Sequence, residues 1–153
     1  MFRALLVPVD FSPTSIEALR LAVRIAQSVG GGALTLLHIG LPPELYYGDL
    51  AAYGFGAPDP SGHLRDRIVA EQTAALERLA VDEIPAGVPF RTLRREGYAP
   101  DEILAEAEGA YDLLVMGTHG RAGLSRALLG SVTERVVRVC PKPVLVTRGP
   151  SGD

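Results

Sequence analysis

Four residues near the carboxyl-terminal end of the chain have the types and the spacing of a phosphate site. Gly117 and Gly120 are separated by two residues, and after nine further residues Gly130 and Ser131 directly precede a stretch with helical periodicity. Glycines let a ligand approach the backbone closely, and the free N–H groups and positive dipole end at the start of a helix attract an anion. The spacing therefore predicts that these four residues bind phosphate groups without the help of a lysine.

Two other phosphate-binding patterns do not fit this chain. A P-loop ends in a lysine followed by Ser or Thr, but the single lysine, Lys142, lies between two prolines. The dinucleotide-binding fingerprint needs a glycine cluster after the first strand, where this chain has Pro8, Val9 and Asp10 instead. The predicted phosphate loop is therefore of another kind.

Ser131 and Asp10 also have simpler interpretations, which the residues alone leave open. Ser131, with a glutamate three residues later, fits a capping box at the start of a helix. Asp10 could hydrogen-bond within a turn that precedes Ser12. A cap explains Ser131 alone, however, and leaves Gly117 and Gly120 unexplained.

The remaining polar residues give no catalytic site. The three histidines do not have the spacing of metal ligands, and His38, at the end of an apolar run, is interpreted as a structural hydrogen-bonding residue. The single cysteine, Cys140, cannot form an internal disulfide and is expected to pack as a small apolar residue. Arg94, Arg95 and Glu96 are interpreted as a solvated strand end.

The composition indicates one packed domain. The chain has 153 residues, 47% of them hydrophobic, and a net charge of −3. This length is enough to bury a core, and the small negative charge gives no general attraction to nucleic acid or anionic membranes. No apolar run approaches the roughly 20 residues that span a bilayer, and the amino-terminal residues lack a signal-peptide pattern. We therefore expect a cytoplasmic protein that binds neither nucleic acid nor membrane.

Short apolar runs alternate with amphipathic stretches, which is typical of a parallel sheet with helices on both faces. Ser12 and Pro13 give the first helix a strong start signal, and glycines at 30–32 end it. Prolines and glycines interrupt residues 40–62, which are expected to form a flexible loop. The helix that follows is expected to place Leu64 on its buried face. The predicted strands cover residues 4–7, 33–38, 90–94, 113–116 and 144–147, and the predicted helices begin near residues 13, 63, 100 and 131.

These elements predict a single-domain, Rossmann-like α/β fold with a five-stranded parallel sheet in the order 3-2-1-4-5. Ligands of such sheets bind beyond the carboxyl ends of the strands, where the winding direction reverses. Here that crevice lies between the first and fourth strands. Residues 8–10 form the loop after the first strand, and residues 116–120 form the loop after the fourth. The domain is expected to span residues 1–148, and residues 149–153 are expected to form a disordered tail.

The motifs resemble those of the universal stress protein family. The spacing of the three glycines and the serine is similar to the ATP-binding signature of that family, and every position of the signature is kept, as in its ATP-binding branch. The resemblance runs from Arg3 to about Arg148 and is weakest in residues 40–62. It rests on separated motifs in the same order, which are VPVDFS at 7–12, VMGTHG at 115–120, LGSVTE at 129–134 and KPVLV at 142–146.

The resemblance implies a site for ATP, or another adenine nucleotide, with Mg²⁺ or Mn²⁺. Asp10 would support the metal ion on the phosphates. His119 and Arg121 would lie beside the phosphates, and Val132 and Thr133 would add backbone amides.

The adenine end of the site is also implied by the resemblance. The backbone of Ile39, after the second strand, would contact the adenine, with Pro8 and Met116 flanking base and ribose. The expected nucleotide-binding residues are Pro8, Val9, Asp10, Ile39, Met116, Gly117, His119, Gly120, Arg121, Gly130, Ser131, Val132 and Thr133.

We therefore expect a nucleotide-dependent regulator of a stress response, with at most slow ATP hydrolysis. No paired carboxylates accompany Asp10, and His119 is the one candidate for a general base near the phosphates, so no catalytic residue is assigned. Two alternatives stay open. One is a stress protein that binds a partner without nucleotide, and the other is an ATPase that a partner activates.

A homodimer is expected through the last strand. Residues 144–147 would form an exposed apolar edge in a monomer, and such edges favour pairing. The family resemblance implies that this strand meets its two-fold mate. Residues 40–62, near the adenine end, are the expected lid, and a protein partner of unknown identity is also expected.

Overall fold

Strands and helices alternate along the chain, of which the computed structural model describes residues 2–41, 63–118 and 129–149. In chain order the elements are β1 (Ala4–Pro8), α1 (Pro13–Ser28), β2 (Ala33–Gly40), α4 (His63–Glu83), β3 (Phe90–Glu96), α5 (Ala99–Ala107), β4 (Leu113–Gly117), α6 (Ser131–Val139) and β5 (Val144–Thr147).

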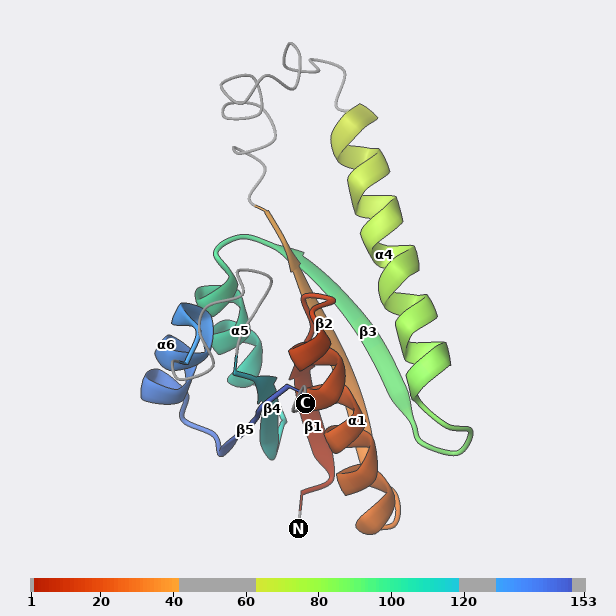
Figure 1. The fold of residues 1–153 in the computed structure, drawn as a ribbon, viewed down its shortest axis with the longest axis vertical. Helices are drawn as coiled ribbons and strands as arrows, with labels where there is room; N and C mark the ends of the chain where they lie inside the picture. Colours follow the sequence, from red (N-terminus) through yellow and green to blue (C-terminus); the bar gives the residue numbers. More distant parts are fainter. Residues whose placement is uncertain (1, 42–62, 119–128, 150–153) are drawn as a thin grey trace.

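All the strands are parallel and form one sheet in the order β3-β2-β1-β4-β5, which confirms the predicted fold (Figure 1). β1 pairs with β2 on one side and with β4 on the other. The winding direction therefore reverses between β1 and β4, in the middle of the sheet.

Helices cover both faces of the sheet (Figure 1). Leu5, Leu6 and Val7 of β1 have no exposed surface, because successive side chains of a strand point to opposite, covered faces. Leu5 and Val7 pack in a cluster that includes Leu76 of α4 and the buried residues of α1. Leu6 packs in the second cluster, with Val136 of α6 and with Ile103 and Ala107 of α5.

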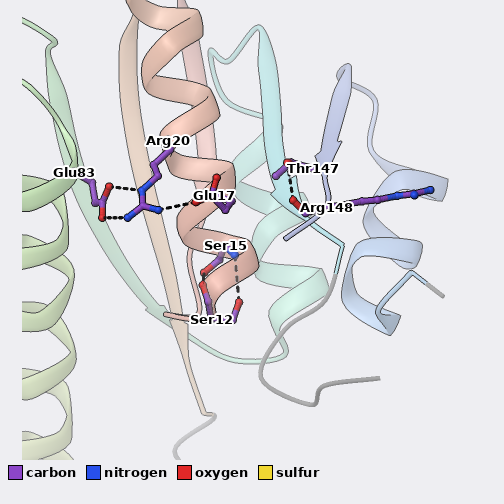
Figure 2. Close-up of polar contacts among 7 residues, drawn as sticks. All are labelled: Ser12, Ser15, Glu17, Arg20, Glu83, Thr147 and Arg148. Atoms are coloured by element: carbon purple, nitrogen blue, oxygen red, sulfur yellow. Dashed lines mark hydrogen bonds and ion pairs between the residues drawn. The ribbon is translucent and has the colours of Figure 1, made fainter. Parts of the chain in front are cut away.

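The first helix starts as predicted. Ser12 is the N-cap of α1, Pro13 is the first helical residue, and the Ser15 N–H donates to the Ser12 hydroxyl at 3.3 Å (Figure 2). After the helix, Gly30 and Gly31 have φ angles of 64° and 116°. Glycine adopts these left-handed conformations without strain, so the glycine run ends α1.

The next helix, α4, extends beyond the sheet at its amino-terminal end (Figure 1). Its fully buried residues are Leu76 and Ala80, in the half that packs on the sheet. Leu64 is 39% exposed, so the prediction that it faces the core is wrong. Helical periodicity gives the direction of a side chain, but it does not show where the sheet beneath the helix ends.

An ion pair joins α1 to the carboxyl-terminal end of α4 (Figure 2). Nε and Nη2 of Arg20 donate to the two carboxylate oxygens of Glu83, each at 2.8 Å. This pairing lowers the pKa of Glu83 below its ordinary value. Arg20 is about half exposed, so solvent screens the pair and its stabilisation is modest.

Asp112 fixes the amino-terminal ends of the two central strands. One of its carboxylate oxygens accepts from the backbone N–H groups of Arg3 at 2.8 Å and Ala4 at 2.9 Å. These hydrogen bonds lower the pKa of Asp112 below its ordinary value of 3.8. The start of β1 is therefore held to the residue that immediately precedes β4.

Replacing this carboxylate should give a pH-dependent loss of stability. Asp112→Asn is expected to lower the melting temperature near neutral pH, because an amide oxygen accepts more weakly than a carboxylate. Since the folded-state pKa is depressed, the carboxylate stabilises the fold above its ordinary pKa of 3.8 and loses that effect as the pH falls through the lower folded value. The difference in melting temperature between the wild type and Asp112→Asn should therefore begin to shrink below about pH 5 and go on shrinking as the pH falls through the depressed folded-state pKa.

Asp82→Asn is the matched control, because Asp82 lies on the exposed surface of α4. It should show no gap of this kind. A gap for Asp112→Asn that stays constant over the same pH range would contradict the assigned role.

Candidate functional site

The carboxyl ends of the central strands form the edge at which the sequence predicts a ligand. Asp10 follows β1, Ile39 lies near the end of β2, and Gly117 ends β4. Because the strands are parallel neighbours, their carboxyl ends lie at the same edge of the sheet. The structure thus brings six of the predicted residues to this edge, which are Pro8, Val9, Asp10, Ile39, Met116 and Gly117.

Gly117 lies against the first turn of α1. A Cβ atom on Gly117 would be 2.8 Å from the carbonyl carbon and oxygen of Thr14, closer than real contacts allow. The glycine is therefore required for packing, whether or not a ligand approaches it. The carbonyl of Gly117 also accepts a hydrogen bond from the Thr133 hydroxyl at 2.8 Å, which ties the end of β4 to α6.

Backbone hydrogen bonds hold the start of α6 beside the end of β4. The Gly130 N–H donates to the Thr118 carbonyl at 2.7 Å, and the Thr118 N–H donates to the Thr147 carbonyl at 2.9 Å. Residues on both sides of the stretch 119–128 are thereby joined. The amino-terminal end of α6 consequently lies at the same edge of the sheet as the end of β4.

The N-cap of α6 is Gly130, not Ser131. The Gly130 carbonyl accepts from the Glu134 N–H at 2.8 Å, and Ser131 is the exposed first residue of the helix. The capping-box interpretation of Ser131 is therefore wrong, because the helix begins one residue earlier than that motif requires. Glycine provides no side-chain oxygen to cap the first turn, so the positive end of α6 receives no such hydrogen bond from its N-cap residue.

Asp10 forms the turn that the simpler interpretation predicts. One of its carboxylate oxygens accepts from the N–H of Ser12 at 3.0 Å and from the Ser12 hydroxyl at 2.5 Å. These bonds fix the direction of the carboxylate as the chain leaves β1. They are compatible with a further role for Asp10, because a carboxylate has lone pairs on two oxygens.

His38 supports this turn from β2, as predicted for a structural histidine. It is 3% exposed, and its Nδ1 lies 2.7 Å from the Val9 carbonyl oxygen. Its ring packs on Phe11 with 4.7 Å between centroids. Phe11 has a φ of 64°, an unusual value for an aromatic residue that no sequence signal indicated. The backbone on both sides of Asp10 is therefore fixed by the fold.

Ile39 and Met116 lie on the opposite side of the sheet from His38. Met116 is 4% exposed and belongs to the cluster beneath α5 and α6, and Ile39 packs against that cluster. Met116 is thus a core residue and Ile39 a partly buried neighbour of the core, and both are candidates for the adenine end of the site.

The strand end at Arg94 and Glu96 is not solvated, which corrects the sequence-based interpretation. The two side chains are only 10% and 12% exposed, and Arg94 Nη1 donates to a Glu96 carboxylate oxygen at 2.9 Å. Arg65 of α4 donates to the other oxygen at 2.6 Å. Burial raises the pKa of Glu96, but the hydrogen bonds from Arg65 and Arg94 together outweigh burial and lower it. Arg95 is the exposed member of the group.

Three predicted residues, His119, Gly120 and Arg121, lie outside the described residues, and so does the expected lid from residue 42 onward. Within residues 2–41, 63–118 and 129–149, no three His, Cys, Asp or Glu side chains form a group that could hold a metal ion. None of the helices in these ranges has the length and apolarity needed to cross a membrane.

Known proteins are similar to this chain in sequence and in fold. A model of the universal stress protein family matches residues 1–148. Universal stress protein MJ0531 of Methanocaldococcus jannaschii is 33% identical over 151 residues, which cover 98% of this chain and 84% of that protein.

Solved structures agree with the family match. The structure of hypothetical protein MJ0577 of the same organism is similar with a TM-score of 0.80, at 28% identity and 99% coverage of both chains. A universal stress protein solved in complex with cAMP has the same fold at 23% identity, with a TM-score of 0.59 and coverage of 96% and 97%. The chain therefore belongs to the universal stress protein family.

Proposed function

We propose that this universal stress protein binds ATP, or another adenine nucleotide, and regulates a stress response according to its nucleotide state. The observation that carries the proposal is the start of α6, which Gly130 and Thr118 hold at the edge of the sheet beside β4. A helix amino terminus that lacks a side-chain cap from its N-cap residue attracts anions. The phosphates would therefore bind at Gly130 and the amides of Ser131, Val132 and Thr133.

Asp10 suits a metal ion that the nucleotide brings with it. Mg²⁺ is commonly held by one or two carboxylates, with phosphate oxygens and waters completing its shell. Asp10 lies at the same edge as α6, and its carboxylate direction is fixed by Ser12. A Mg²⁺ or Mn²⁺ ion bound to the phosphates would need only this one carboxylate from the protein.

The base would lie over the ends of β1, β2 and β4, where Pro8, Ile39 and Met116 are found. Backbone N–H and C=O groups at the carboxyl end of β2 provide the kinds of donor and acceptor that recognition of a base requires. The family member solved with cAMP supports the class of ligand, since cAMP contains adenine.

Regulation by nucleotide, rather than rapid catalysis, is the activity that the residues favour. His119 remains the candidate for a general base, and hydrolysis is expected to be slow at most. A cytoplasmic location and a protein partner stay predictions. The alternatives are a partner-activated ATPase and a stress protein that works without nucleotide, and the following titration separates the second of these from the proposal.

Calorimetric titration with Mg-ATP should show binding to the wild type and none to Gly130→Val. The φ and ψ of Gly130, −60° and 150°, suit a valine, so the fold should survive while the new side chain fills the space over the start of α6. We expect affinity to fall by at least about a hundredfold.

Lys142→Ala is the control for this titration. Lys142 precedes β5 at the amino-terminal end of the sheet, so it lies at the opposite edge from the proposed site. Its removal should leave affinity unchanged. A wild type that binds no nucleotide would overturn the proposal and favour the partner-binding alternative.

A homodimer through β5 is also proposed. The sheet has two edge strands, β3 and β5. β3 carries two exposed arginines, Arg91 and Arg95, and charged edges resist pairing, whereas β5 has the sequence VLVT. β5, the uncharged edge strand, is therefore the one suited to pair with a second copy of the chain.

Light scattering at micromolar concentration should show a dimer. Leu145→Arg, on β5, should raise the dissociation constant at least about tenfold, because two-fold symmetry would place like charges together. Val81→Arg changes another exposed apolar residue, on α4, and should leave the dimer intact. A monomeric wild type would contradict the proposed interface.

A further inference from the structure

The end of β2 is held by side chains and backbone from β3 and α4. The Gly97 N–H donates to the carbonyl of Gly40, the last residue of β2, at 3.2 Å. The guanidinium of Arg94 lies directly on Gly40, since a Cβ atom there would be 2.4 Å from Arg94 Nη2 and 3.0 Å from Gln72 Oε1. Arg94 can therefore cross the strand end only because residue 40 has no side chain.

Four hydrogen bonds fix this arginine and its carboxylate partner. Nε and Nη2 of Arg94 donate to Gln72 Oε1 at 2.9 Å and 2.8 Å, and Nη1 donates to Glu96 at 2.9 Å. The second oxygen of Glu96 accepts from Arg65 at 2.6 Å. Glu96 thus lies between two guanidinium groups, one from its own strand and one from α4. Removing a charge from such a largely buried group leaves its partners poorly compensated.

The network reaches the proposed adenine position through the backbone. In the β2–β3 register, Ile39 is opposite Arg95 and Gly40 is opposite Glu96. Ile39 itself packs on the α5 and α6 side of the sheet. Because successive residues of a strand face opposite sides, His38 and Gly40 face the side of α1 and α4 and are supported from there. His38 provides that support through Val9, and Gly40 receives it from Arg94.

We infer that Glu96 is a positioning residue, which through Arg94 fixes the backbone of Ile39 for contact with the base of the nucleotide. This inference rests on the proposed function. Glu96 does not touch the nucleotide; it keeps the end of β2 in the conformation that binds it. When only a tenth of the molecules hold a competent conformation, the apparent affinity falls about tenfold.

The test compares two carboxylates that each form an ion pair at one end of α4, Glu96 with Arg65 and Glu83 with Arg20. Glu96→Gln removes the charge near the amino-terminal end of α4, and Glu83→Gln removes the charge that pairs with Arg20 at its other end. Calorimetric titration with Mg-ATP should give about tenfold weaker binding for Glu96→Gln and a change within about twofold for Glu83→Gln. Circular dichroism checks that both variants are folded.

Tripolyphosphate with Mg²⁺ separates positioning of the base from general loss of structure. It has no base, so in a direct titration it should bind the wild type and Glu96→Gln with equal affinity. The inference would be overturned if Glu96→Gln weakened tripolyphosphate binding as much as ATP binding, or if the two glutamine variants bound ATP with equal affinity. Either result would leave the proposed function standing. A wild type that binds no ATP would overturn both the inference and the proposed function. If tripolyphosphate binds neither the wild type nor Glu96→Gln, the ATP affinities of the two glutamine variants decide the outcome.

Gly40→Ala is a second variant in case Glu96→Gln does not fold. It displaces the Arg94 guanidinium and changes no charge, since its Cβ would occupy the space that the guanidinium fills. We expect the same tenfold loss of ATP affinity. Unchanged ATP affinity in this variant would contradict the role of the network.

Discussion

Burial of β1 is the constraint on which the rest of the structure depends. Leu5, Leu6 and Val7 have no exposed surface, because β1 pairs with strands on both sides and is covered by helices on both faces. A strand in this position cannot shift its register without exposing a complete apolar face. The residues that follow it, including Asp10, are therefore delivered to a fixed point at the edge of the sheet, and β2 and β4 end beside them.

Short hydrogen bonds convert this position into a defined geometry. His38 holds the Val9 carbonyl, the Thr133 hydroxyl holds the Gly117 carbonyl, and Gly130 bonds to Thr118. Each bond joins a residue at one strand end to a neighbouring strand end or helix. Binding a ligand at such an edge requires little ordering of the described backbone, so more of the contact free energy would appear as affinity.

Much of the fold could be predicted because its signals are local. Apolar runs gave the strands, and Ser12 with Pro13 gave the start of α1. The residues alone leave the N-cap of α6 open because Gly130 and Ser131 are both acceptable N-caps, and only the backbone angles distinguish them. The buried state of Arg94 and Glu96 could not be predicted, since their partners Gln72 and Arg65 are 22 and 31 residues away in sequence. The sequence order of the strands predicts that the residues after β1 and β4 meet at one end of the sheet, as they do, whereas the supporting contacts depend on tertiary structure.

The attachment of α4 has a consequence for the ionic conditions in which the protein works. Of its 21 residues, Leu76 and Ala80 are fully buried, while arginine–carboxylate pairs hold it near both ends. Dissolved salt screens and weakens the more exposed of these pairs, whereas apolar packing is not screened. As ionic strength rises, amide hydrogens near the ends of α4 should exchange with solvent before those of the strands beneath it.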